Sequence, residues 1–320
     1  MSPSVDPRSV RVVAEKDFRD AIRSRALLLL GTVFVVFFAV AAFFFADQFQ
    51  QFLDNAAASN NTTQRQAARM ARERLTSDAF LSSLTTITRL LVPLTAIVVS
   101  YAALVGERES GTLKLLLSLP HSRASAVLGK FVGRSGVVAV PVLLGFVVAA
   151  PVFPITGVPF EAVGFAAFAL ATALLGVVFV AVSVGTSAAA PTSRRAVVFI
   201  VGLYALFTLL WGQFSSAVFR QVQNYADLSQ VASVKAFLVL RHLNPVRTYE
   251  SLVASVGPTG ELAARTSLLG GFNGQLAAQI LRQNGGLPVY LTDAALVGYL
   301  LLWIAVPLAL GVLAFERLDL

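Results

Sequence analysis

The sequence lacks cysteine entirely and is poor in charged residues and histidine. The absence of cysteine among 320 residues excludes disulfides, thiolate metal sites and a cysteine nucleophile. Charged residues make up 13% of the chain, whereas about a quarter of a soluble domain is charged. The histidines are His121 and His242, and neither a His-Glu-x-x-His pattern nor a carboxylate cluster indicates a metal site. With 56% apolar residues and a mean hydropathy of +0.74, the sequence predicts an integral membrane protein.

A phosphate-binding loop is also missing. The stretch from Gly106 to Gly111 begins like the pattern Gly-x-x-x-x-Gly-Lys-Ser/Thr, but Thr112 stands where the lysine would contact phosphate. We therefore expect this chain to bind no cofactor itself. The formal charge of +8 comes from 25 basic residues spread over every segment without aromatic interleaving, which argues against a nucleic-acid partner and favours an anionic lipid surface.

Predominantly apolar stretches long enough to cross a bilayer recur along the chain. The predicted spans are residues 26–46, 86–106, 132–152, 162–186, 196–219 and 292–315. They leave two outer segments, 47–85 and 220–290, and a charged insert over 107–130. The sequence thus predicts an all-α integral membrane protein with six spans in a single transmembrane domain, 1–320. We expect the first span to be retained, because it is too long for the apolar core of a signal peptide.

Basic residues are concentrated at the amino terminus, whereas the connection over 151–161 holds none. By the positive-inside rule the amino terminus is cytoplasmic, and six crossings place the insert and the carboxyl terminus on the same side. We expect the protein in the cell membrane with both termini in the cytoplasm. Arginines in the first outer segment count against this orientation: Arg65, Arg69, Arg72 and Arg74.

Two segments outside the spans are predicted to be helical. Within residues 5–25, Val10, Ala14 and Phe18 recur at helical spacing, which predicts an amphipathic helix lying at the membrane surface. A plain basic flank with incidental periodicity is the alternative. The outer segment 220–290 is too long for a structureless loop, so we expect short helices on the outer surface.

The insert combines a charged start with the pattern of a short helix. Ser110 or Thr112 can cap a helix, and Pro120 disfavours helix at the residue before it. Three leucines between these points share one helical face: Leu113, Leu116 and Leu117. The residues predict a short amphipathic helix parallel to the membrane, serving either as a structural turn or as a partner site.

The run Glu-Arg-Glu-x-Gly-Thr-Leu-x-Leu-Leu-Leu-Ser-x-Pro-x-Ser-Arg over 107–123, with Gly-Lys at 129–130, resembles the signature segment of ABC-type export permeases of the ABC-2 type. More narrowly, it is similar to permeases of nitrous-oxide-reductase maturation systems and to relatives that export sodium, drugs or antibiotics. The six-span layout fits as well, so the resemblance covers the whole chain.

The resemblance implies that the insert is a coupling helix that docks in a cleft of a separate ATPase subunit, which binds ATP and Mg²⁺. It also implies an assembly of two permeases and two ATPases. The residue roles that it implies are ion pairing with the ATPase for Glu107 and Glu109, the tight turn for Gly111, filling of the cleft for Leu113, Leu116 and Leu117, and anchoring at lipid headgroups for Arg123 and Lys130. Thr112 and Pro120 belong to the same ATPase-coupling segment.

Alternatives remain open for other polar residues. Six could line a substrate path along a permease dimer, although ordinary interhelical hydrogen bonding also accounts for them: Thr95, Ser100, Tyr101, Ser183, Tyr204 and Thr208. A second hypothesis is a membrane scaffold or maturation component whose segment 220–290 binds an extracytoplasmic accessory protein. A third is an intramembrane hydrolase using Ser135 of Gly133-Arg134-Ser135-Gly136, against small-residue helix packing at the same place.

Overall fold

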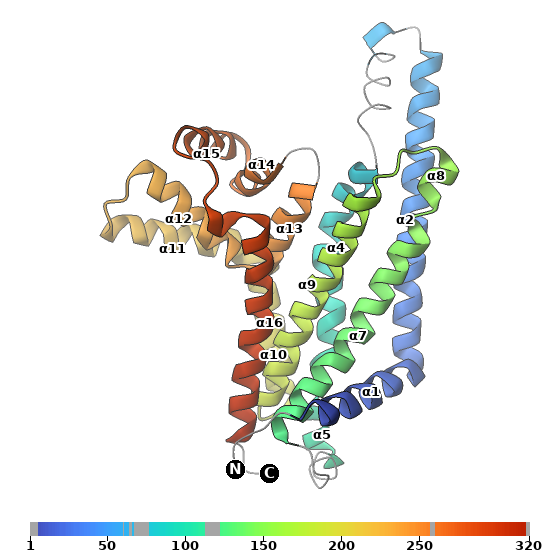
Figure 1. Cartoon of the computed structure of the whole chain (residues 1–320), viewed down its shortest axis with the longest axis vertical. Coiled ribbons are helices and arrows are strands. Elements are labelled where there is room, and N and C mark those ends of the chain that lie inside the picture. Colours follow the sequence, from blue (N-terminus) through green and yellow to red (C-terminus); the bar gives the residue numbers. More distant parts are fainter. Residues whose placement is uncertain are drawn as a thin grey trace.

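The computed structural model describes residues 6–59, 61–63, 66, 77–112, 122–256 and 260–317, and within these ranges every regular element is a helix (Figure 1). The helices are α1 (Pro7–Arg23), α2 (Arg25–Ala58), α4 (Ser77–Ser100), α5 (Val105–Glu109), α7 (Arg123–Ala149), α8 (Val152–Thr156), α9 (Ala162–Ala189), α10 (Ser193–Ala205), α11 (Trp211–Tyr225), α12 (Gln230–His242), α13 (Pro245–Val256), α14 (Gly260–Ser267), α15 (Gly271–Gln283) and α16 (Asp293–Glu316). A π-helical turn, Leu206–Leu210, joins α10 to α11, and a 3₁₀ turn, Val289–Leu291, precedes α16.

The predicted number of membrane spans is confirmed. Six stretches are long and apolar enough to cross a bilayer: Leu28–Ala58, Phe80–Glu109, Arg123–Thr156, Ala162–Ala189, Ser193–Tyr225 and Asp293–Glu316. Most of them extend past the apolar runs predicted from the sequence, because the helices continue into polar flanks. The chain is therefore an all-α membrane protein with six candidate spanning helices.

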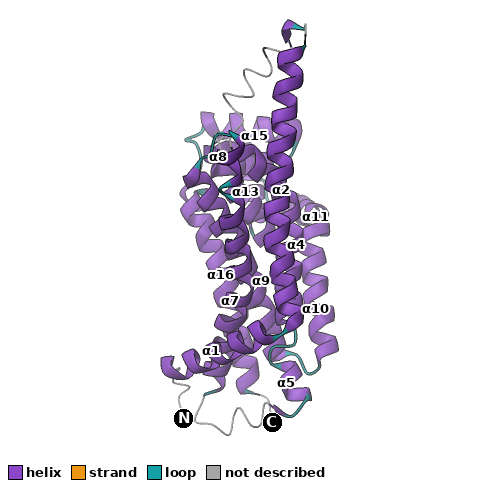
Figure 2. Cartoon of the chain, turned by 90° about the vertical axis from the view of Figure 1, so that its right-hand side faces the viewer, coloured by secondary structure: helices purple, strands orange, loops and turns teal. Residues whose placement is uncertain are grey.

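Helix α9 forms the centre of the bundle, packed against α4, α7, α13 and α16 (Figure 1). Its small side chains permit close approach: a Cβ atom on Gly185 would lie 2.2 Å from the Pro307 carbonyl oxygen of α16. Both chain termini lie at one end of the bundle, here called the basal end, and α2 projects beyond the other helices at the opposite, apical end (Figures 1 and 2).

Helix α1 lies across the basal end and packs on α7 (Figure 2). Asp6 caps it by accepting the N–H groups of Arg8 and Ser9, each at 3.1 Å. The two helices touch where α7 has no side chains, because a Cβ on Gly129 would lie 2.5 Å from Val13 Cβ. The small-residue packing predicted near Ser135 is thus confirmed, while the position of α1 at the membrane surface stays a prediction.

The segment after α11 forms the expected short helices, but one of them is not on the surface. Helix α13 packs against α4, α9 and α16. Its Tyr249 is fully buried, with the hydroxyl 2.8 Å from Thr88 Oγ1 and 3.0 Å from Thr172 Oγ1. Because these hydroxyls satisfy one another, Tyr249 can enter the bundle without leaving its own hydroxyl unpaired.

His242, at the end of α12, gives the protein a predicted acid sensitivity. Burial lowers the pKa of His242 to about 4, and its Nδ1 donates to the Leu238 carbonyl oxygen at 2.7 Å. Since the folded pKa lies below the ordinary 6.5, the unfolded chain takes up the proton first, and stability falls as the pH drops from about 6.5 to 4, by roughly 3 kcal/mol. Thermal unfolding in detergent at pH 7.5 and 4.5 should show a smaller acid loss for His242→Gln than for wild type. Equal acid-induced losses of stability in the two proteins would contradict this prediction.

Candidate functional site

The charged start of the insert is held against α9. Helix α4 ends at Ser100, the chain turns, and α5 begins at Val105. The Ser187 hydroxyl of α9 accepts the N–H groups of Leu104 and Val105, both at 3.1 Å. These are groups that a helix cannot satisfy within its own first turn. The turn between α4 and α5, which leads into the insert, is therefore bonded to the central helix α9.

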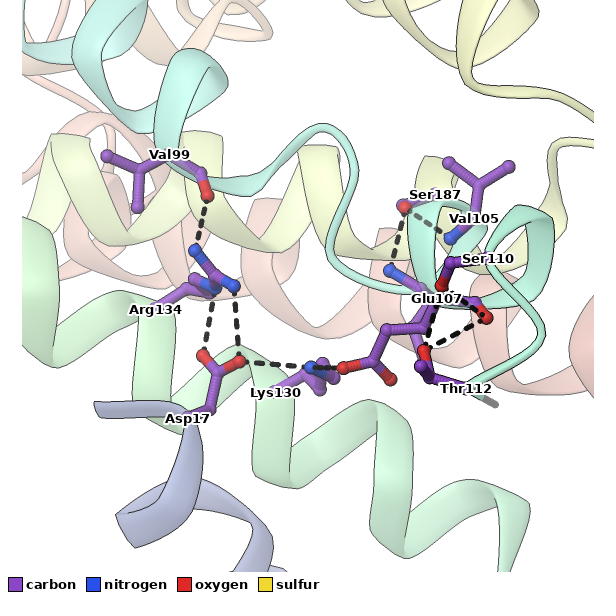
Figure 3. A network of polar contacts seen from close by, with 10 residues as sticks. Asp17, Val99, Val105, Glu107, Ser110, Thr112, Lys130, Arg134 and Ser187 are labelled. Atoms are coloured by element: carbon purple, nitrogen blue, oxygen red, sulfur yellow. Dashed lines mark hydrogen bonds and ion pairs between the residues drawn. The ribbon is translucent and has the colours of Figure 1, made fainter. Parts of the chain in front are cut away.

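Four charged side chains from three helices then form one cluster at the basal end, here called the basal cluster: Asp17 of α1, Glu107 of α5, and Lys130 and Arg134 of α7 (Figure 3). Lys130 Nζ lies 3.0 Å from Asp17 Oδ1 and 2.5 Å from Glu107 Oε1. Arg134 Nε lies 2.8 Å from Asp17 Oδ2, and its Nη1 donates to the Val99 carbonyl oxygen at 2.9 Å.

Burial makes these contacts consequential. Lys130 and Asp17 are each only 5% exposed, whereas the Glu107 side chain is 30% exposed. Buried charges are tolerated only when they are paired, and here two acids oppose two bases. Lys130 and Arg134 are four residues apart, so they face the same side of α7. The cluster joins α1, α5 and α7 and can transmit a displacement of any one of them to the other two.

Arg108 and Glu109 extend these connections to two further helices. The Arg108 guanidinium donates to the carbonyl oxygen of Ala190, at the end of α9. Glu109 accepts the Ser193 N–H at 2.8 Å and the Ser193 hydroxyl at 2.6 Å, at the start of α10. A cation at a helix carboxyl terminus and a carboxylate at an amino terminus are both favourable arrangements.

The far border of the insert contacts the last span. Arg123, the first residue of α7, donates through Nη1 to the carbonyl oxygens of Phe315 and Glu316, at 2.9 and 3.0 Å. Its guanidinium carbon also lies 5.8 Å from the centre of the Phe315 ring. The two borders of the insert bond to each other through Glu107 and Lys130, and together they bond to α1, α9, α10 and α16.

Between the borders, the structure describes only the beginning of the insert. Gly111 has φ of +77°, a left-handed conformation that favours glycine and suits the tight turn assigned to it. Thr112 Oγ1 donates to the Glu107 carbonyl oxygen at 3.2 Å. The other predicted contact residues, Leu113, Leu116, Leu117 and Pro120, lie outside the described residues, so the coupling helix itself stays a prediction.

One predicted role needs correction. Lys130 was expected at the lipid headgroups, but it is buried between two carboxylates. Glu107 and Glu109 contact this chain's own Lys130 and Ser193, and their pairing with an ATPase stays a prediction. Lys130 is buried because α1 covers this side of α7. The position of Lys130 in the sequence, beside a charged insert, did not reveal this packing.

Sequence reasoning missed Asp17, Arg134 and Ser193. A signal for Asp17 was available, since it falls among the apolar residues of α1 at four-residue spacing from Val13 and Ala21, both buried. A carboxylate at the centre of an apolar helical face indicates a buried cation nearby. No such signal marks Ser193, whose contact depends on how α5 meets α10.

The six candidate path residues differ in burial and in hydrogen bonding. Tyr204 donates to the Leu90 carbonyl oxygen at 3.0 Å, and Thr208 donates to its own helix at Tyr204. Ser100 and Ser183 are fully buried, and their hydroxyls have no hydrogen-bond partner among the described residues. Thr95 and Tyr101 are partly buried. A substrate path through these residues stays a prediction.

Catalytic arrangements find no support in the described part of the chain. It contains no group of three or more His, Asp or Glu residues that could hold a metal ion. The Ser135 hydroxyl is buried and lacks a hydrogen-bond partner there, so no described side chain is placed to activate it as a nucleophile.

Comparison with known proteins matches residues 11–320 to the family described as ABC-2 family transporter protein. Two relatives are named as probable ABC transporter permease proteins NosY. One, from Pseudomonas aeruginosa, is 29% identical over 313 residues that cover 96% of this chain and 98% of the relative. The other, from Stutzerimonas stutzeri, is 30% identical over 313 residues that cover 95% of this chain and 97% of the relative.

Proposed function

The chain belongs to the ABC-2 family of transporter proteins, and on that premise we propose that it is the permease subunit of an ATP-driven exporter. A separate ATPase, which binds ATP and Mg²⁺, docks on the insert over residues 107–130. Two permeases and two ATPases form the complex in the cell membrane, with the termini and the insert in the cytoplasm. The observation that carries the proposal is the bonding of the insert's borders to four other helices, α1, α9, α10 and α16.

This arrangement divides the insert into two parts with different tasks. The leucine face of the insert supplies the docking contact. Glu107, Arg108 and Glu109 act within the permease and pass the displacement on, to α7 and α1 through Lys130 and to the corner between α9 and α10. Arg123 carries the same displacement to α16. Small movements at a docking site can shift whole helices, because a packed interface between helices switches from one arrangement to another and does not deform continuously.

Variants of the two parts should therefore fail differently. Leu116→Asp should abolish co-purification of the ATPase, because a charge in an apolar cleft is strongly disfavoured. Glu109→Ala should leave the ATPase bound but reduce transport-coupled ATP hydrolysis about tenfold, as expected from losing hydrogen bonds to a charged group. Pull-down and ATPase assays on the reconstituted complex measure the two effects.

Glu15→Ala is the matched control, because Glu15 is an exposed acid paired only with Arg19 on the same helix. It should change neither binding nor coupling. If the Glu109→Ala permease no longer co-purified with the ATPase, Glu109 would have to be assigned to the docking surface. A Leu116→Asp permease that keeps a fully coupled ATPase would refute the proposed docking site.

A further inference from the structure

A continuous apolar groove runs between α1, α2 and α7 at the basal end. One cavity of about 410 Å³ lies among all three helices, and a second of about 510 Å³ lies between α1 and α7. The two share Phe18, Gly136 and Val140 in their walls. They are therefore treated as one feature, the basal groove.

Glycines open this groove. A Cβ on Gly136 would lie 3.1 Å from the Phe18 ring, and one on Gly31 would lie 3.3 Å from Pro141 Cγ. The remaining walls are mostly aliphatic, including Val140 and Leu144, which are 43% and 50% exposed. An apolar groove of this kind does not hold water well, because water needs polar partners.

The groove also lies where lipid would surround the protein. Its α2 wall extends from Leu28 to Val35, at the start of a candidate spanning helix, and its α7 wall reaches Leu144 within another. The groove thus begins at the basal boundary of the bundle and continues into its membrane-spanning part. A lipid acyl chain is an occupant of the right chemistry, because it is as apolar as the aliphatic walls and needs no polar partner.

Charges at the two ends of the groove favour an anionic headgroup. Arg11 lines one end, and Arg25 lies one helical turn before Leu28 at the other. Both are exposed, and neither forms an ion pair within the described residues. The acid that also lines this side, Glu15, is neutralised by Arg19 at 2.5 Å. The ends of the groove are therefore basic.

We propose that the basal groove is a binding site for one anionic phospholipid of the adjacent leaflet. Its acyl chain lies between α2 and α7 against Phe18 and Val140, and its phosphate contacts Arg11 or Arg25. The lipid would fasten α1, which carries Asp17 of the basal cluster, to the first span. This site is independent of ATPase docking on the insert.

Native mass spectrometry of the full-length protein in detergent tests the proposal. The protein is titrated with palmitoyl-oleoyl phosphatidylglycerol or with the corresponding phosphatidylcholine. Wild type should retain one phosphatidylglycerol per chain and bind it at least about fivefold more tightly than phosphatidylcholine, given the contribution of a basic residue near a lipid headgroup. Val140→Trp should fill the groove and lower phosphatidylglycerol binding about tenfold.

Matched variants separate the groove from the general lipid belt. Val147→Trp adds the same ring to an exposed position of α7 outside the groove, so phosphatidylglycerol binding should not change. The double variant Arg11→Gln, Arg25→Gln disturbs no buried residue and should abolish the preference for phosphatidylglycerol. Equal binding of the two lipids to wild type would overturn the anionic assignment. Equal losses in Val140→Trp and Val147→Trp would overturn the groove itself.

Discussion

Lys130→Met should destabilise the folded protein by about 3–5 kcal/mol, because it removes a cation held between two carboxylates. Asp17 is 5% exposed and cannot regain its hydration without moving α1. Among the described residues, Arg134 would remain the one cationic partner of Asp17, and Glu107 would lose its cationic partner. Thermal unfolding in a mild detergent, followed by circular dichroism, measures the loss.

A second substitution separates stability from coupling. In the double variant Lys130→Met, Glu107→Gln, the remaining pair of Asp17 and Arg134 is again neutral, so most of the lost stability should return. The link between α5 and α7 stays broken. We therefore expect an ATPase that binds to this permease but is not stimulated by transport. If coupling returned together with stability, Lys130 would be a structural residue and would have no part in transmission.

An Arg134→Met variant is the matched comparison on the same helix. It also removes a basic partner of Asp17, but leaves the bond between Lys130 and Glu107 in place. Its stability should fall, while coupling in the fraction that folds should be preserved. A loss of coupling as large as that of Lys130→Met would show that the whole cluster, and not the Glu107 link, transmits the displacement.

The spans were predictable because bilayer thickness imposes a length and a composition that can be read locally. The break after α4 was predictable from the charged residues that follow it, since charge cannot enter hydrocarbon cheaply. By contrast, the burial of Lys130 depends on Gly129, which brings α1 against α7. A sequence shows that Gly129 could allow a close contact, but not which helix makes it.

The apical end shows the same limit. The segment 220–290 was expected to form short helices on the outer surface, because it is too long for a structureless loop. In the structure, polar residues of α13 are buried together with their partners: Thr248 donates to the His242 carbonyl oxygen at 2.6 Å, and Glu250 bonds to Arg89 and Arg247. Glu250 is acceptable in the interior partly because Arg89, on the distant helix α4, pairs with it, and such pairing leaves no periodic signal in the sequence.

Arg265→Met should be the most damaging change at the apical end. Arg265 of α14 is fully buried, and its Nε donates to the Leu291 carbonyl oxygen at 2.7 Å. Its Nη1 lies 2.8 Å from the Ser251 carbonyl oxygen and 3.0 Å from the Ser251 hydroxyl, and its Nη2 pairs with Asp293. One guanidinium therefore joins α13, α14, the 3₁₀ turn and the start of α16.

Methionine has a similar length but donates no hydrogen bond, so the buried carbonyl oxygens of Leu291 and Ser251 would each lose the bond from the guanidinium. We expect a loss of about 3 kcal/mol, since hydrogen bonds to a charged group contribute roughly 1.5–3 kcal/mol each and Asp293, at 41% exposure, can turn to water. Arg265→Lys should recover only part of the loss, because an ammonium cannot reproduce the planar fork. Hydrogen exchange should accelerate first in α14 and α15.

Arg282→Met on α15 is the control, because Arg282 is exposed and lines an open cavity. The unfolding temperature of Arg282→Met should match that of wild type. An equal drop in unfolding temperature in both methionine variants would contradict the role of Arg265 in joining α13, α14, the 3₁₀ turn and α16. Since Arg265 shares no partner with the basal cluster, its loss should leave the ATPase bound and coupled in whatever protein remains folded. Lys130→Met, Glu107→Gln should show the opposite behaviour, with a stable fold and no coupling, so the two variants separate the apical scaffold from the basal transmission site.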